Sequence, residues 1–210
     1  MISLKNLILE GYGLLCCAAL PALLLSIRRP ERCLARAERI RRGVLFCLFV
    51  FYLAGVLSVT GAGTLWDLLH RGWSFPAGQL NLALFASPPF SSGFLLNILL
   101  FVPLGFLIPM LWPGRWRVPL AAVCGAGFSL AIECSQLLNS RITDLDDLVA
   151  NALGALAGAL AAVLLRLVFC QKRTSSTQSA LGAPLFLAAA FLGRFLLFDE
   201  LRAAGWLYGF

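Results

Sequence analysis

The fold is decided by two stretches, NILLFVPLGF at residues 97–106 and AIECSQLLNSRITDLDDLVANALGALAGALAAVLL at residues 131–165. With their flanks they contain three apolar runs of membrane length, because about 20 helical residues at about 1.5 Å each cross roughly 30 Å of hydrocarbon. Polar side chains occur near one end of each run. They are Asn97, Glu133, Gln136, Arg141, Asp144, Asp147 and Asn151. We predict that these side chains converge at one face of the bilayer.

The composition of the whole chain is that of a membrane protein. Of 210 residues, 60% are hydrophobic and 13% are charged, and the mean hydropathy is +0.87. A backbone exposed to lipid must satisfy its own hydrogen bonds, and these runs lack the alternation of β-barrel strands. The sequence therefore predicts an all-α, multi-pass integral membrane helical bundle with about six transmembrane helices. The expected spans are residues 7–27, 43–59, 92–112, 118–138, 148–170 and 181–198.

We divide the chain into four segments. Residues 1–60 hold two N-terminal transmembrane helices with a basic cytoplasmic loop, and residues 61–91 form an outer interfacial loop. Residues 92–170 form a core of three transmembrane helices, and residues 171–210 form a cytoplasmic linker and a C-terminal transmembrane helix. In the outer loop, LWDLLHRGW at 65–73 predicts a short interfacial helix, and the prolines after it predict irregular structure.

The basic residues predict the orientation. Three loops hold Arg28, Arg29, Arg32, Arg36, Arg39, Arg41, Arg42, Arg115, Arg117, Lys172 and Arg173. The opposite side holds only Lys5, Arg71, Arg141 and Arg202. The positive-inside rule then places both termini outside the cytoplasm. We interpret the net charge of +7 as a topology signal and expect no nucleic-acid partner.

The sequence lacks the motifs of common catalytic and cofactor sites. It contains no CxxC, GxxxxGK[ST], GxSxG or HExxH, and its single histidine, His70, lies in the outer loop. The pair Asp144 and Asp147 alone is a weak indication of a metal site. We expect no cofactor, no metal and no disulfide, and we favour a non-enzymatic role while leaving an enzyme open.

Helical spacing predicts which of the polar residues share a face of their helix. Glu133 and Gln136 share a face of their helix at i and i+3, with Ser129 one turn deeper. A stripe on the next helix contains Asp144, Asp147, Asn151, Gly154 and Gly158. The two glycines form a GxxxG pair that permits close approach of a neighbouring helix. We predict a tight hairpin between these two helices.

A purely structural interpretation remains open for each acidic residue. Thr143 followed by Asp146 resembles a capping box, and acidic residues in a first turn favour the helix dipole. Glu133 is different, because a carboxylate buried without a partner costs several kcal/mol. It is expected to pair with Arg141, to bond with Gln136 or Asn151, or to stay protonated. Either a structural Glu133–Arg141 pair or a ligand-binding or proton-handling group satisfies this requirement.

Several motifs together resemble the VanZ-like family of small bacterial membrane proteins. They are NLALF at 81–85, NILLFVPLGF at 97–106, Glu133xxGln136 and RITDLDDLVANALGALAG at 141–158. The resemblance covers about residues 81–165 and implies an association with teicoplanin resistance. By position it implies the following characteristic residues: Asn97, Phe101, Pro103, Gly105, Glu133, Gln136, Arg141, Asp144, Asp147, Asn151 and Gly154. We expect Pro103, Gly105, Gly154 and Gly158 to serve helix packing.

Three functions are compatible with these features. The first is a cell-envelope protein whose polar site at outer headgroup level contributes to tolerance of teicoplanin-type glycopeptides. Its expected partners are membrane lipids, a lipid-linked envelope precursor or a lipoglycopeptide. The alternatives are an intramembrane enzyme that acts on a lipid-linked substrate through Glu133, and a small transporter with a relay of buried polar groups.

Overall fold

A computed structural model describes residues 4–27, 36–72, 78–81, 83–84, 91–114, 117–139, 141–168 and 181–209. Eight helices and two short strands occur within these residues. The helices are α1 (Leu4–Ile27), α2 (Arg36–Val59), α3 (Leu65–Arg71), α4 (Ser92–Leu111), α5 (Arg117–Gln136), α6 (Leu145–Val168), α7 (Gly182–Leu197) and α8 (Glu200–Tyr208). The strands are β1 (Leu80–Asn81) and β2 (Thr143–Asp144).

The prediction of an all-α multi-pass bundle is confirmed. Helices α1, α2, α4, α5 and α6 are each long and apolar enough to cross a membrane. Helices α7 and α8 meet at a bend of 51° and pass the same test as one broken span. The expected sixth span, residues 181–198, corresponds to α7, and the chain continues past the bend as α8. The bend falls at Asp199, which begins a new helix by accepting a hydrogen bond from the backbone N–H of Arg202.

The basic segment before the second span is more helical than predicted. Helix α2 begins at Arg36, so the four arginines from 36 to 42 lie in its first two turns. Glu38 pairs there with Arg41 at 2.8 Å and with Arg42 at 3.8 Å. Such i,i+3 and i,i+4 pairs support an exposed helical turn. Arg28, Arg29, Arg32, Arg115, Lys172 and Arg173 lie outside the described residues.

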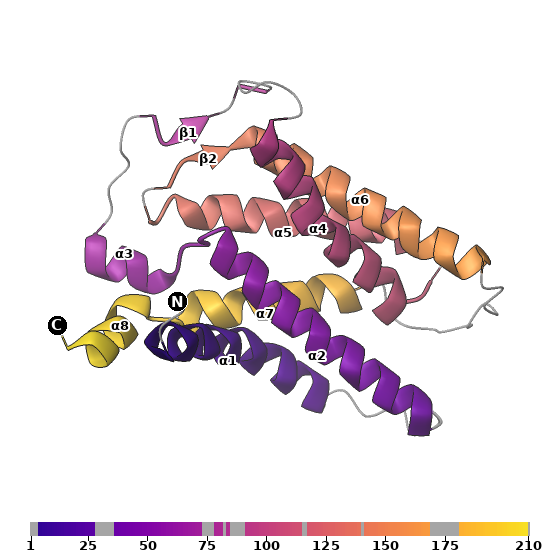
Figure 1. Cartoon of the computed structure of the whole chain (residues 1–210), viewed down its shortest axis with the longest axis horizontal. Coiled ribbons are helices and arrows are strands. Elements are labelled where there is room, and N and C mark those ends of the chain that lie inside the picture. Colours follow the sequence, from indigo (N-terminus) through magenta and orange to yellow (C-terminus); the bar gives the residue numbers. More distant parts are fainter. Residues whose placement is uncertain are drawn as a thin grey trace.

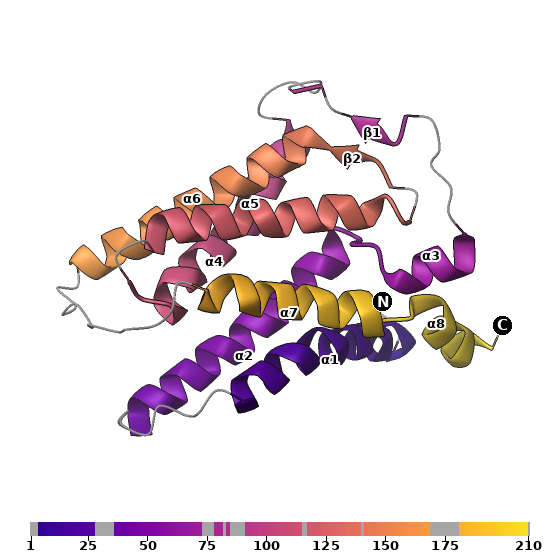
Figure 2. The ribbon, with the colours of Figure 1, turned by 180° about the vertical axis from the view of Figure 1, so that it is seen from behind.

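Two groups of helices pack against each other in the bundle. Helices α4, α5 and α6 form one group, and α1, α2 and α7 form the other (Figures 1 and 2). Buried aromatic side chains fill the space between them, with Phe49 and Phe186 stacked at 5.7 Å and Trp112 against both. We call the end where α1, α4 and α6 begin the polar end. It also carries α3, β1, β2 and α8, towards the left in Figure 1.

The closest helix approach differs from the predicted hairpin. A Cβ added at Gly154 would overlap the carbonyl oxygen of Ile98 on α4, and one at Gly158 would overlap that of Val102. In return, a Cβ at Gly105 on α4 would overlap the carbonyl of Ala155 on α6. The GxxxG face thus packs on α4, whereas we expected it to serve the α5–α6 hairpin. The spacing predicted a close contact but could not identify the partner helix.

Helix α4 contains Pro103 and is followed by Pro113. Pro103 lies inside the helix with its side chain exposed, so the packing expected for it is not seen. At the end of the helix, Pro113 has no N–H to offer the carbonyl of Pro109. Arg166 of α6 donates to that carbonyl instead, at 3.0 Å. The far end of α4 is therefore fixed to α6 as well.

Candidate functional site

Glu133 is held by the chain that enters α6. Its carboxylate oxygen Oε2 accepts a hydrogen bond from the backbone N–H of Asp144 at 3.0 Å, and its carbonyl accepts from Thr143 Oγ1 at 3.0 Å. The side chain is buried, with 5% of its surface exposed. In the described part of the chain no cation lies within ion-pair distance of it. The expected pair with Arg141 is therefore wrong, and so are the expected bonds with Gln136 and Asn151.

Asp144 begins α6. Its Oδ1 accepts from the backbone N–H of Asp146 at 2.9 Å, which satisfies one of the free donors of the first turn. Its Oδ2 accepts from Asn81 Nδ2 at 3.1 Å. The predicted capping box of Thr143 and Asp146 is therefore wrong by one residue. Thr143 lies in a strand, and its hydroxyl is already used on α5.

Two amide side chains extend the polar site into the bundle. Asn97 of α4 donates from Nδ2 to Asp147 Oδ1 of α6 at 2.6 Å. One turn deeper, Asn151 donates from Nδ2 to Ser129 Oγ of α5 at 2.9 Å. The amide oxygen of Asn151 is buried and has no hydrogen-bond partner among the described residues. These contacts fix α4, α5 and α6 in register around the carboxylates.

Gln136 and Arg141 point to a different partner, the turn at residues 60–64. Gln136 Nε2 donates to the carbonyl of Thr60 at 2.8 Å, and Arg141 Nη1 donates to the same oxygen. The guanidinium of Arg141 occupies the place of a side chain at Gly61, whose φ of 62° suits glycine. Gly63 donates its N–H to Ser135 Oγ at 3.0 Å. These two predicted site residues thus join α2 to the end of α5.

A short segment of the loop between α2 and α4 covers the α5–α6 connection. Strand β1 pairs in parallel with β2, with Leu80 opposite Thr143 and Asn81 opposite Asp144. Before the strand, the carbonyl of Gln79 accepts the N–H of Thr143 at 2.8 Å. The side chain of Gln79 is buried and donates to the carbonyl of Leu137 at 3.1 Å. We predicted irregular structure for this segment. Of Gln79, Leu80 and Asn81, only Asn81 belongs to a motif identified in the sequence, NLALF at 81–85.

The site is rich in acceptors, and among the described residues none of its carboxylates forms an ion pair with a cation. The Glu133 carboxylate contacts the backbone of Asp144, and Asp147 follows in the first turn of α6, so the site gathers three acidic side chains. Buried amide oxygens of Gln79, Gln136 and Asn151 have no partner among the described residues. Within those residues, no group of three His, Cys, Asp or Glu side chains is placed to hold a metal ion. The arrangement can accept hydrogen bonds from a ligand and attract a cationic group.

His70 lies outside this cluster. It is exposed on α3, with Nδ1 2.8 Å from the carbonyl of Trp66 and 3.9 Å from Asp199 Oδ1. Helix α3 occupies Leu65–Arg71, as predicted for an interfacial helix, and begins with a capping box formed by Thr64 and Asp67. It attaches to α7 through Trp66, whose indole N–H donates to the carbonyl of Leu196 at 3.0 Å.

The chain matches a known protein family. The family model described as VanZ/LLP1 matches residues 43–168. The match begins in α2 and ends with α6, so it includes Asn97, Glu133, Asp144 and Asp147. It also extends further toward the N-terminus than the sequence motifs did. No curated protein and no solved structure matches the chain.

Proposed function

The chain belongs to the VanZ/LLP1 family, and from this premise we propose that it contributes to tolerance of teicoplanin-type glycopeptides. The proposed site is the polar cluster of Glu133, Asp144, Asp147 and Asn97. The observation that carries the proposal is a set of three neighbouring carboxylates with no cation within ion-pair distance among the described residues. Such a set favours a ligand that brings hydrogen-bond donors or positive charge.

The depth of the cluster supports a ligand that is anchored in the membrane. Glu133 lies one turn before the end of α5, and Asp147 lies in the first turn of α6. If these helices span the bilayer, both side chains lie at headgroup level. A drug with a lipid tail, or a lipid-linked envelope precursor, holds its polar part at this level. A glycopeptide without a tail does not.

The arginines of α2 support the outer side as the location of the site. Arg36, Arg39, Arg41 and Arg42 lie at the opposite end of the bundle from β1 and β2 (Figure 1). Clusters of arginine close to a transmembrane helix are retained in the cytoplasm. The polar end would then face outward, where glycopeptides act.

A small transporter is the second candidate. The observation in its favour is the Asn151–Ser129 pair, which continues the polar groups one turn deeper beneath the carboxylates. A transported ion or proton would need such a continuation through the bundle.

The test is the minimal inhibitory concentration in a susceptible Gram-positive host, for a lipid-tailed glycopeptide and for vancomycin. The wild-type chain is expected to raise tolerance to the tailed drug more than to vancomycin. Glu133→Gln and Asp147→Asn should abolish this, because each removes a charge. Each also keeps an oxygen that can accept the bond from Asp144 N or from Asn97 Nδ2.

Glu10→Gln is the matched control. Glu10 is a carboxylate at the same end of the bundle, it is exposed, and it bonds to Ser58 on α2 outside the cluster. This variant should protect as the wild type does, with equal protein in the membrane fraction by immunoblot. Full protection by Glu133→Gln and Asp147→Asn would contradict the role of the cluster. If the wild type protects against neither drug, the resistance proposal fails and transport becomes the first candidate.

A further inference from the structure

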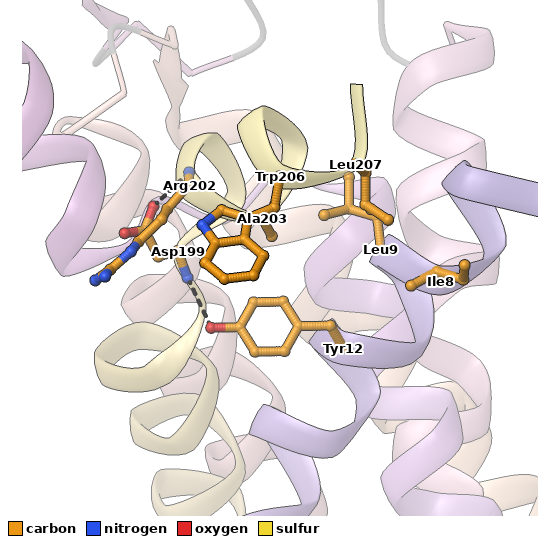
Figure 3. Close-up of a pocket in the computed structure, with 8 residues that line it drawn as sticks. All are labelled: Ile8, Leu9, Tyr12, Asp199, Arg202, Ala203, Trp206 and Leu207. Atoms are coloured by element: carbon orange, nitrogen blue, oxygen red, sulfur yellow. Dashed lines mark hydrogen bonds between the residues drawn. The ribbon is translucent and has the colours of Figure 1, made fainter. Parts of the chain in front are cut away.

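A groove lies between α1 and α8, away from the polar cluster. It has a volume of about 360 Å³ and is lined by Ile8, Leu9, Tyr12, Asp199, Arg202, Ala203, Trp206 and Leu207. Figure 3 shows the polar side chains Asp199 and Arg202 at one end. The rings of Tyr12 and Trp206 lie in the middle, and Ile8, Leu9 and Leu207 lie at the other end. The groove is thus amphipathic along its length.

The position and composition of α8 favour placing this groove at the membrane interface. The bend at Asp199 turns α8 away from the direction of α7 by 51°. The Trp206 side chain is 87% exposed, which suits the headgroup region, where tryptophan is enriched. Tyr208 attaches α8 to the start of α1 by a hydrogen bond with Asn6 and by a Lys5 ammonium 4.9 Å from its ring centre. This position favours a ligand that has both a polar head and an apolar tail.

The polar end of the groove is lined by Asp199 and Arg202, and His70 of α3 lies 3.9 Å from Asp199 Oδ1. Asp199 is 95% buried by its neighbours, being 5% exposed, and its Oδ1 accepts the N–H of Arg202 at 3.0 Å. Its Oδ2 is buried and has no hydrogen-bond partner among the described residues. A buried carboxylate oxygen without a donor is costly, so a donor from a ligand would stabilise it. The Arg202 side chain is exposed and can bind a phosphate.

We propose that this groove binds a phospholipid whose head carries a phosphate and a protonated primary amine, as in phosphatidylethanolamine. The phosphate binds Arg202, the ammonium donates to Asp199, and part of one acyl chain lies against Leu9, Trp206 and Leu207. The volume matches the lower end of small-molecule sites, about 300–1,000 Å³, so the groove takes part of the lipid and leaves the rest in the bilayer.

The test compares three lipids with identical acyl chains on the full chain in detergent, by native mass spectrometry. Phosphatidylethanolamine is expected to be retained roughly tenfold over phosphatidylcholine, which has the same charges but no N–H donor; tenfold corresponds to about one charge-assisted hydrogen bond. Phosphatidylglycerol, which lacks the positive charge, should bind more weakly than phosphatidylethanolamine.

Three variants locate the binding. Asp199→Asn keeps an N-cap side chain for α8 and should remove the preference for phosphatidylethanolamine over phosphatidylcholine. Arg202→Gln should lower retention of both lipids alike, and Ala203→Trp should lower it by filling the groove. Arg71→Gln changes an exposed arginine of α3 outside the groove and should have no effect.

The proposal is overturned by any of three results. Equal retention of the three lipids would mean that only the apolar wall binds. Preference for phosphatidylglycerol would mean that net negative charge is recognised. Unchanged retention in Ala203→Trp, in protein that melts as the wild type does, would place the lipid elsewhere.

Discussion

Gly158→Ala is expected to separate α4 from α6. The added Cβ would overlap the carbonyl oxygen of Val102 and lie 2.8 Å from the backbone nitrogen of Phe106. Ordinary contact distances between nonbonded heavy atoms are about 3.5–4.0 Å, so even the second contact is short by about 1 Å. Both atoms belong to the backbone of α4 and cannot rotate away. The whole helix must therefore shift.

The expected cost follows from two opposing effects. Overpacking of this kind costs about 1–3 kcal/mol, and replacing glycine by alanine within a helix returns about 0.5–1 kcal/mol. The two ranges leave a net cost of about 0–2.5 kcal/mol. Because the added Cβ meets backbone atoms, we expect the free energy of unfolding, measured by denaturant titration in detergent, to fall by about 1–2 kcal/mol. Asn97 and Asp147 bridge the same two helices, so the shift should also weaken the polar site.

Gly127→Ala on α5 is the matched control. A Cβ there meets nothing within 4 Å, so this variant should be as stable as the wild type or more stable by about 0.5–1 kcal/mol. Equal effects of the two substitutions would refute the reasoning, because the close approach of α4 would then have no energetic consequence.

Three further predictions concern single contacts, each measured by the same unfolding titration. Ser129→Ala should cost about 1–3 kcal/mol by leaving the buried Asn151 amide without its acceptor, and adding Asn151→Ala should cost less than the sum of both. Glu133→Gln and Arg141→Gln should be additive within about 0.5 kcal/mol, because the two side chains bind different partners. Strong coupling between these two substitutions would show that Glu133 and Arg141 do form an ion pair. Arg166→Leu should cost about 1 kcal/mol by leaving the Pro109 carbonyl without its side-chain donor, and an unchanged unfolding midpoint would show that water replaces the arginine.

The sequence predicts which end of a helix a polar side chain occupies, but it does not predict which partner that side chain contacts. Residue number along a helix fixes how far Asn97, Glu133 and Asn151 lie from its end, and the structure does gather carboxylates and amides at one end of α4, α5 and α6. The same numbers do not say which neighbour each side chain meets. Arg141 therefore binds the turn at 60–64, although its distance in the chain from Glu133 suggested a pair.

Two elements were missed for different reasons. Strand β1 pairs with residues more than 60 positions away, and no local pattern predicts a two-residue parallel pairing over such a separation. Helix α8 did carry a signal. Asp199 followed by Glu200 is an N-cap with an acidic first turn, which marks a new helix where we had expected the last span to end.

The proposed function depends on the polar end facing outward, and one labelling experiment tests this directly. Ile142 lies between α5 and α6, next to Thr143 of β2, and 66% of its surface is exposed. Ile142→Cys, in a chain whose seven native cysteines are replaced by alanine or serine, should react in intact cells with a maleimide that cannot cross the membrane. Labelling that appears only after the cells are permeabilised would place the cluster in the cytoplasm and contradict a site that meets glycopeptides at the outer surface.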